Sequence, residues 1–96
     1  MTKTVANIGG NISVQTNAAG ANWVAFPAGR CKRLTICNDT TTAIEFRQGA
    51  TPGVPITVED KAQFVIEGLS NCNQIEVRRK DQGATQVTVK ARWGSW

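Results

Sequence analysis

The chain has 96 residues, of which 41% are hydrophobic and only 19% are charged. It therefore has the length of one domain, because a second core would leave neither half enough buried surface. The net charge is +4 and there is no histidine, which excludes Cys-His and Ser-His nucleophile pairs and removes the commonest general base. No segment approaches the ~20 apolar residues of a membrane helix, and no N-terminal run resembles a signal peptide. We expect synthesis in the cytoplasm and no membrane contact.

A two-residue alternation of apolar and polar side chains runs along the chain and predicts β-strands. It is clearest in residues 87–93, VTVKARW. The expected strands, in chain order, are residues 11–15, 23–26, 33–37, 43–47, 54–58, 63–67, 74–78 and 85–93. Residues 1–10, which end in Gly9-Gly10, are expected to form a flexible N-terminal arm, and residues 94–96 a C-terminal tail. No stretch has the period of a helix.

About eight short strands with turn residues every ~8–12 positions predict an all-β, single-domain antiparallel β-sandwich, jelly-roll-like, over residues 11–93. Pro55 predicts an edge position for its strand, since proline cannot donate to a sheet ladder. Phe26, Phe46 and Phe64 occupy apolar positions in register with the alternation and are expected in the core. The alternative is a closed five-stranded barrel of the oligonucleotide-binding type, but such a barrel normally needs a helix between its third and fourth strands.

Cysteine usage indicates thiols without a catalytic or metal role. Cys31, Cys37 and Cys72 are odd in number, so they cannot all pair within one chain. Free, half-buried thiols are expected, with a Cys37–Cys72 bridge as the alternative. Three cysteines without histidine and without a CxxC spacing do not make a zinc site. No cofactor and no metal are expected.

The carboxylates have an equally structural pattern. Glu45 and Glu76 each alternate with an arginine, Arg47 and Arg78. On neighbouring strands this predicts cross-strand ion pairs on a solvated face rather than a catalytic carboxylate pair. We therefore expect no enzymatic activity.

Tryptophan and clustered basic residues are the candidates for a contact surface. Trp96 ends the chain, and a large apolar side chain is costly to leave in water. We therefore expect Trp93 and Trp96 at an interface with another subunit or a shell. The alternative is that Trp96 folds back on its own domain. Trp23 is expected in the core or at an interface, with carbohydrate stacking as the alternative. The most compact positive charge is Arg78-Arg79-Lys80. It is typical of either a nucleic-acid contact or solvated strand ends, and we favour the latter.

Four segments of the chain resemble the small β-sandwich structural proteins of tailed bacteriophages. A strand ending in an Asn-Asp turn is followed by an aliphatic-Glu-Phe-Arg strand, a Gly/Pro loop and a strand ending in Val-Glu-Asp; here these are residues 32–39, 44–47, 56–60 and 64–66. The resemblance covers residues 30–93. It implies a virion component without enzymatic activity, such as a capsid decoration (cement) protein, a head-fibre base or a neck or tail protein. Such proteins are commonly homotrimers seated on capsid local threefold positions.

Together these observations predict a non-enzymatic virion protein, most simply a capsid decoration protein that binds and stabilises the assembled head as a homo-oligomer, in particular a trimer. Its expected partners are its own copies and the major capsid protein or other virion proteins. A carbohydrate- or receptor-binding sandwich that uses Trp23 and the Thr40–Thr42 loop is one alternative, and a neck or tail component is another. A single-strand nucleic-acid binder that uses Arg78, Arg79, Lys80 and Arg92 is the third.

Overall fold

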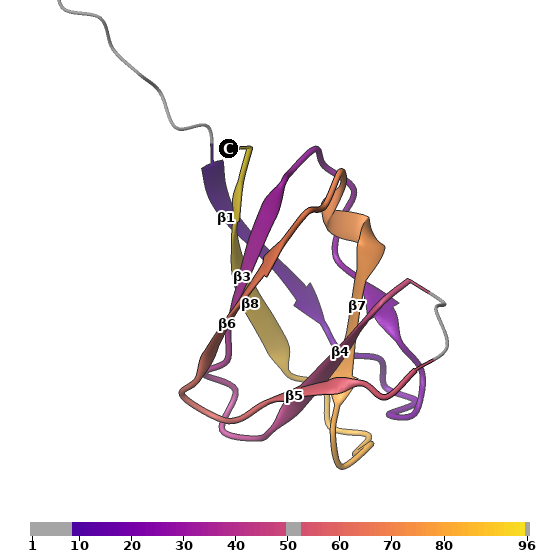
Figure 1. Cartoon of the computed structure of the whole chain (residues 1–96). Helices are drawn as coiled ribbons and strands as arrows, with labels where there is room; N and C mark the ends of the chain where they lie inside the picture. The colour runs from indigo at the N-terminus through magenta and orange to yellow at the C-terminus, as the bar shows by residue number, and fades with distance from the viewer. Residues whose placement is uncertain (1–8, 50–52, 96) are drawn as a thin grey trace, which may run out of the picture.

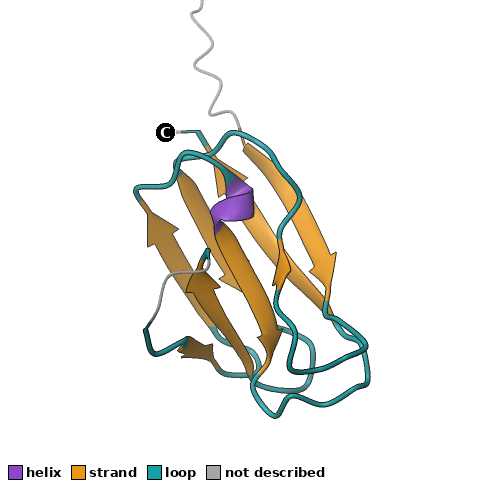
Figure 2. Ribbon diagram, turned by 90° about the vertical axis from the view of Figure 1, so that its right-hand side faces the viewer, coloured by secondary structure: helices purple, strands orange, loops and turns teal. Residues whose placement is uncertain are grey.

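The computed structural model describes residues 9–49 and 53–95, which form two antiparallel sheets of four strands each, packed face to face (Figures 1 and 2). Sheet 1 has the strand order β1-β8-β3-β6 and sheet 2 the order β2-β7-β4-β5. The strands are β1 Gly9–Gln15, β2 Val24–Ala25, β3 Arg33–Cys37, β4 Ile44–Gln48, β5 Ile56–Val58, β6 Gln63–Glu67, β7 Ile75–Arg79 and β8 Thr88–Gly94.

The pairing of these strands is that of a jelly roll. The first strand pairs with the last, and the pairs then close inward: β1 with β8, β2 with β7, β3 with β6 and β4 with β5. Contacts of β3 with β8 and of β4 with β7 complete the two sheets. This is the double-sheet arrangement of eight strands that defines the jelly roll. The predicted fold is therefore confirmed, and the closed barrel is excluded.

The core lies between the sheets and comes from every second residue of the strands. Leu34 and Ile36 of β3 face Ile44 and Phe46 of β4, and all four are buried. Phe26 is also buried, as predicted.

The prediction that Phe64 lies in the core is wrong, because 36% of its side chain is exposed. The reason is that β6 is an edge strand of sheet 1. No further strand covers this side of the sandwich within the described ranges 9–49 and 53–95. The Phe64 ring packs on that of Phe46, with 5.1 Å between centroids.

Two local features differ from the sequence prediction. Gly9 and Gly10 are the first residues of β1 rather than a flexible break. Gly10 lies under the indole of Trp93, and a Cβ atom there would come within 3.0 Å of Trp93 Nε1. The glycine therefore permits a close contact between β1 and β8. Just before β7, Cys72–Gln74 forms one turn of 3-10 helix, so the strand begins at Ile75 and not at residue 74 as predicted. Asn71 and Gln74 form a capping box at the start of this turn.

Asn38, which follows β3, ties the two sheets together at one end of the sandwich. Its side chain is 2% exposed and donates to the carbonyl oxygens of Thr42 and Val58, each at 2.8 Å. Its Oδ1 accepts from the backbone N–H and the hydroxyl of Thr40, at 3.1 and 2.7 Å. Because Val58 ends β5 and Thr42 lies just before β4, both strands of sheet 2, this one amide fixes a connection between the layers.

Replacing Thr41 with glycine should stabilise the protein. Thr41 has φ of 74°, in the left-handed region that a β-branched residue adopts only with strain. Its backbone N–H donates to Asp60 Oδ1 at 3.0 Å, and glycine keeps this bond. We expect the free energy of unfolding to rise by about 0.5–1 kcal/mol in urea denaturation. The reason is that the relief of backbone strain in the folded state outweighs the extra conformational entropy that glycine gives the unfolded chain. Thr57→Gly, in the extended backbone of β5, is the control and should destabilise.

Candidate binding surfaces

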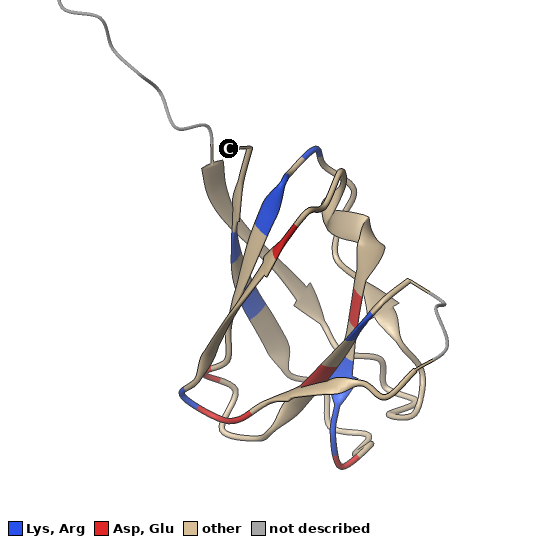
Figure 3. Cartoon of the chain, in the orientation of Figure 1, with Lys and Arg blue, Asp and Glu red and all other residues tan. Residues whose placement is uncertain are grey.

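Trp23 and Arg78, two residues predicted to form a contact surface, lie together on the outer face of sheet 2. The Arg78 guanidinium carbon is 4.3 Å from the centre of the Trp23 ring, and that of Arg47 is 4.6 Å from it. Glu45 lies directly opposite Arg78, and their side chains pair at 2.6 Å. Arg47 pairs in the same way with Glu76 at 2.7 Å. Figure 3 shows the resulting alternation of acidic and basic positions on β4 and β7.

This cluster confirms the predicted cross-strand ion pairs, but Glu45 is buried and not on a solvated face as predicted. The guanidinium groups of Arg47 and Arg78 both lie against the Trp23 ring at cation–π distance, so this ring is already in contact with two cations of its own domain. Arg78 is held further by a hydrogen bond of 2.9 Å to the carbonyl oxygen of Ala21. The arrangement is a rigid, charge-balanced surface in which the tryptophan serves as a packing residue for two arginines.

The other basic residues of the triplet do not join this cluster. Arg79 forms two hydrogen bonds to the carboxylate of Asp81, at 2.9 and 2.7 Å, and a third to the carbonyl oxygen of Thr85. The first of these contacts, with help from the N–H of Gly83, lowers the pKa of Asp81 below its usual value. Lys80 is exposed in the turn. The triplet is therefore split into two neutralised arginines and one solvated lysine, not a continuous cationic patch.

Trp93 packs against its own domain. It is half-buried, faces inward from β8 and lies at the margin of the core, over Gly10. Trp96 lies outside the described residues, so its expected interface role stays a prediction.

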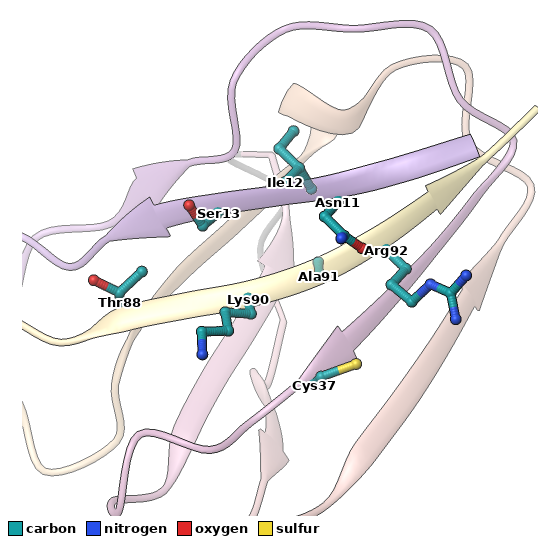
Figure 4. Close-up of a pocket in the computed structure, with 8 residues that line it drawn as sticks. All are labelled: Asn11, Ile12, Ser13, Cys37, Thr88, Lys90, Ala91 and Arg92. Carbon is teal, nitrogen blue, oxygen red and sulfur yellow. The ribbon is translucent and has the colours of Figure 1, made fainter. Parts of the chain in front are cut away.

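The outer face of sheet 1 carries a hollow that the sequence did not reveal. Two adjoining depressions, of about 520 and 690 Å³, share the residues Asn11, Cys37 and Arg92. The strand register explains this grouping, because Asn11, Arg92 and Thr35 form one row across the sheet and Ser13, Lys90 and Cys37 the next. Figure 4 shows the side chains of Lys90 and Arg92 rising from β8 on the same side as Cys37. The hollow is thus an open surface in which the basic side chains Lys90 and Arg92 stand beside smaller polar and apolar residues.

The charge of this face is positive. Lys90 pairs with Asp39 at 3.2 Å and Arg33 with Glu67 at 2.9 Å, both with exposed partners. Arg92, in the middle strand of the face, is exposed and forms no ion pair with any other described residue. Figure 3 shows the basic positions on β3 and β8. An unneutralised guanidinium beside this hollow favours an acidic partner.

A second exposed feature is an apolar edge where β5 and β6 border the open side of the sandwich. Its residues are Val54, which is 92% exposed, Val65 at 51%, Ile56 at 45% and Phe64 at 36%. The prediction that Pro55 marks an edge is confirmed, since β5 ends sheet 2. The signal for β6 was present in the sequence as Phe64-Val65-Ile66, an unbroken apolar run that places apolar side chains on both faces of the strand. We call Val54, Ile56, Phe64 and Val65 the apolar edge.

The arrangement of the cysteines differs from the Cys37–Cys72 bridge that was the alternative prediction. Cys31 and Cys72 are neighbours, with 3.0 Å between their sulfur atoms, while Cys37 is on the outer face of sheet 1. A Cys37–Cys72 bridge is therefore wrong. The expectation of half-buried thiols holds for Cys37 only, because Cys31 and Cys72 are buried. Burial raises the pKa of the Cys31 thiol from 9.0 to about 12, with the hydrogen bond and charge of Cys72 acting in the same direction.

The raised pKa of Cys31 predicts a loss of stability in alkali. The folded thiol keeps its proton to about pH 12, whereas the unfolded one loses it near pH 9. The contribution is therefore complete below pH 9 and is lost as the pH rises toward 12. We expect the free energy of unfolding to fall by up to about 1.4 kcal/mol per pH unit in this window. Urea titrations of the reduced protein at several pH values would measure this slope, and Cys31→Ala should flatten it. An equal slope in the variant would contradict the assignment.

Among residues 9–49 and 53–95, no group of three or more histidine, cysteine or carboxylate side chains is placed to hold a metal ion. None of the helical structure in the same part of the chain is long and apolar enough to cross a membrane. The fold and these surfaces define the protein as a small jelly roll with a cationic face and an apolar edge. No family model, curated protein or solved structure matches the chain.

Proposed function

We propose that the protein is a non-enzymatic structural protein of a virion, in particular a capsid decoration protein that binds an assembled head as a homo-oligomer. The jelly roll supports the proposal as an architecture used by viral capsid proteins, although it also serves lectins and cupins. The resemblance of residues 30–93 to phage structural proteins points to the same class. A neck or tail position in the virion is the nearest alternative.

The observation that carries the proposal is the apolar edge. Exposed side chains of this kind, grouped on neighbouring edge strands, mark association sites in soluble proteins. The edge strand β6 contains no proline or lysine, and its one charged residue, Glu67, is at its end and paired with Arg33. Burial against other copies would cover Val65 and Phe64 and complete the open side of the sandwich. A homotrimer is the expected assembly.

The cationic face of sheet 1 is the proposed contact with the shell. Arg92, in the middle of this face, supplies charge that no described residue neutralises. A protein of net charge +4 is attracted to acidic shell surfaces, and the attraction weakens with salt. The two proposed surfaces adjoin at Val65, which follows Arg92 and Thr35 in one row across sheet 1.

Light scattering of the purified protein tests self-association. The wild type should have three times the chain mass of 10.3 kDa at micromolar concentration. Val65→Glu should shift it to the monomer, because a charge in an interface core costs several kcal/mol. Thr88→Glu, an exposed change on the same face but away from β6, is the matched control and should leave the mass unchanged. A wild-type monomer, or a Val65→Glu variant of unchanged mass, would contradict the role of the edge.

Co-sedimentation with capsids purified from the source of the gene tests the function itself. The wild type should bind in many copies per particle, and Arg92→Glu should weaken binding at least tenfold, or about 1.4 kcal/mol, because it opposes an acidic surface. Lys80→Glu has the same charge change at the other sheet and should bind normally. No binding to heads would overturn the decoration role, and binding to isolated tails would place the protein there instead.

Retention on a glycan array that Trp23→Ala abolishes would favour the carbohydrate-binding alternative.

A further inference from the structure

Two buried thiols from segments far apart in the chain meet between the sheets. Cys31 lies just before β3 of sheet 1, and Cys72 lies in the 3-10 turn before β7 of sheet 2. They are 41 positions apart, yet their sulfur atoms are 3.0 Å apart, and their residues are 2% and 1% exposed. Ordinary packing of two thiols does not require such an approach.

The backbone on both sides holds this pair in place. Arg30 and Asn71 form an isolated antiparallel bridge. The N–H of Cys72 donates to the carbonyl oxygen of Gly29 at 2.8 Å, and Asn71 Oδ1 accepts from the N–H of Gly29 at 3.0 Å. The two segments therefore form a short ladder with the cysteines on it. The sulfur separation of 3.0 Å is about 1 Å longer than the ~2.0 Å of a disulfide bond.

We propose that Cys31 and Cys72 form an intramolecular disulfide that links the segment entering β3 to the segment entering β7, and that Cys37 stays a free thiol. The bridge joins the two sheets at the end of the sandwich where the 3-10 turn lies. It requires no partner protein and does not depend on the proposed virion function. An oxidising surrounding, such as that of particles released from a cell, is where such a bond persists.

The chemistry is thiol–disulfide exchange with a small disulfide such as oxidised glutathione. One cysteine loses its proton, and its thiolate attacks a glutathione sulfur, which breaks the glutathione disulfide and releases one glutathione thiolate. The second cysteine thiolate then attacks the first cysteine's sulfur and expels the other glutathione. The protein loses two protons and two electrons, and one oxidised glutathione becomes two reduced molecules.

Burial determines when this reaction can occur. In the folded protein neither sulfur is accessible, and the thiol pKa of Cys31 is raised, so little thiolate is present. Oxidation should therefore be slow in the native protein and fast in a partly unfolded or refolding chain. Once formed, the same burial protects the bond from reductants. Because it closes a loop of about 40 residues in the unfolded chain, it should raise the thermal midpoint by about 10 °C or more.

The experiment is refolding from denaturant with a mixture of reduced and oxidised glutathione, followed by intact-mass analysis under non-reducing conditions. Cys37→Ser is the principal variant because it leaves the pair intact. It should lose the mass of two hydrogen atoms, resist alkylation after unfolding, and melt at lower temperature once reduced. Cys31→Ala and Cys72→Ala should each stay free of an internal disulfide under the same treatment.

Two outcomes would overturn the proposal. One is a Cys37→Ser protein in which both remaining thiols can still be alkylated after oxidative refolding. The other is a bridge that involves Cys37 in the wild type. The mass and the alkylation of the Cys37→Ser protein decide the question even if the two alanine variants fail to fold.

Discussion

Replacing Asn38 with alanine should lower the free energy of unfolding by about 3 kcal/mol. The change removes two hydrogen bonds to the carbonyl oxygens of Thr42 and Val58 and two from Thr40. The net loss per bond is about 1 kcal/mol, and the buried carbonyl of Val58 loses a donor that water cannot easily replace. For a domain of this size the thermal midpoint should fall by roughly 12–24 °C. Thermal unfolding followed by circular dichroism measures it.

Two variants separate the amide's role from a general effect on the turn. Asn38→Asp keeps the acceptor for Thr40 but places a carboxylate against two carbonyl oxygens, so it should be at least as destabilising as alanine. Asp39→Asn, at the next position, removes only the exposed contact with Lys90 and should cost less than about 1 kcal/mol. If Asn38→Ala cost no more than Asp39→Asn, the amide would not be the link between the sheets.

Reversing the charge of Arg78 should also destabilise the protein strongly. Its partner Glu45 is buried, and the two residues are directly opposite on β7 and β4. Arg78→Glu would place two carboxylates against each other and remove one of the guanidinium groups on Trp23. We expect a loss of about 3 kcal/mol or more in urea denaturation, because a buried charge is left without its partner. Arg78 is therefore unsuitable as a surface probe of binding, and Arg92 is the better choice.

A charge swap provides the control for this prediction. Glu45→Arg combined with Arg78→Glu restores opposite charges and should recover part of the lost stability. The neighbouring pair is more exposed, so Arg47→Glu beside Glu76 should cost less than Arg78→Glu beside Glu45. Equal costs at the two sites, or no recovery in the swap, would show that burial of Glu45 does not set the energy.

Several parts of the fold could be predicted because they depend only on neighbours in the chain. A strand buries every second residue, so alternation located all eight strands to within a few positions. Pro55 identified one sheet edge because a missing N–H donor is a property of the residue itself. The ion pairs of Glu45 and Glu76 followed from the same alternation, since strands that each carry an acid and a base two residues apart can pair in register.

The sequence by itself thus determined an all-β domain, its strands and its charge-balanced face, while the tertiary structure decided which distant segments meet. Alternation does not say which strand ends a sheet, so it placed Phe64 in the core although β6 is an edge. It also does not say which residues of different strands share a row, so the hollow around Arg92 was not foreseen. Cys31 and Cys72 come together through a bridge between Arg30 and Asn71, which are 41 positions apart. Such contacts depend on the strand order of the whole jelly roll, and no local sequence pattern specifies that order.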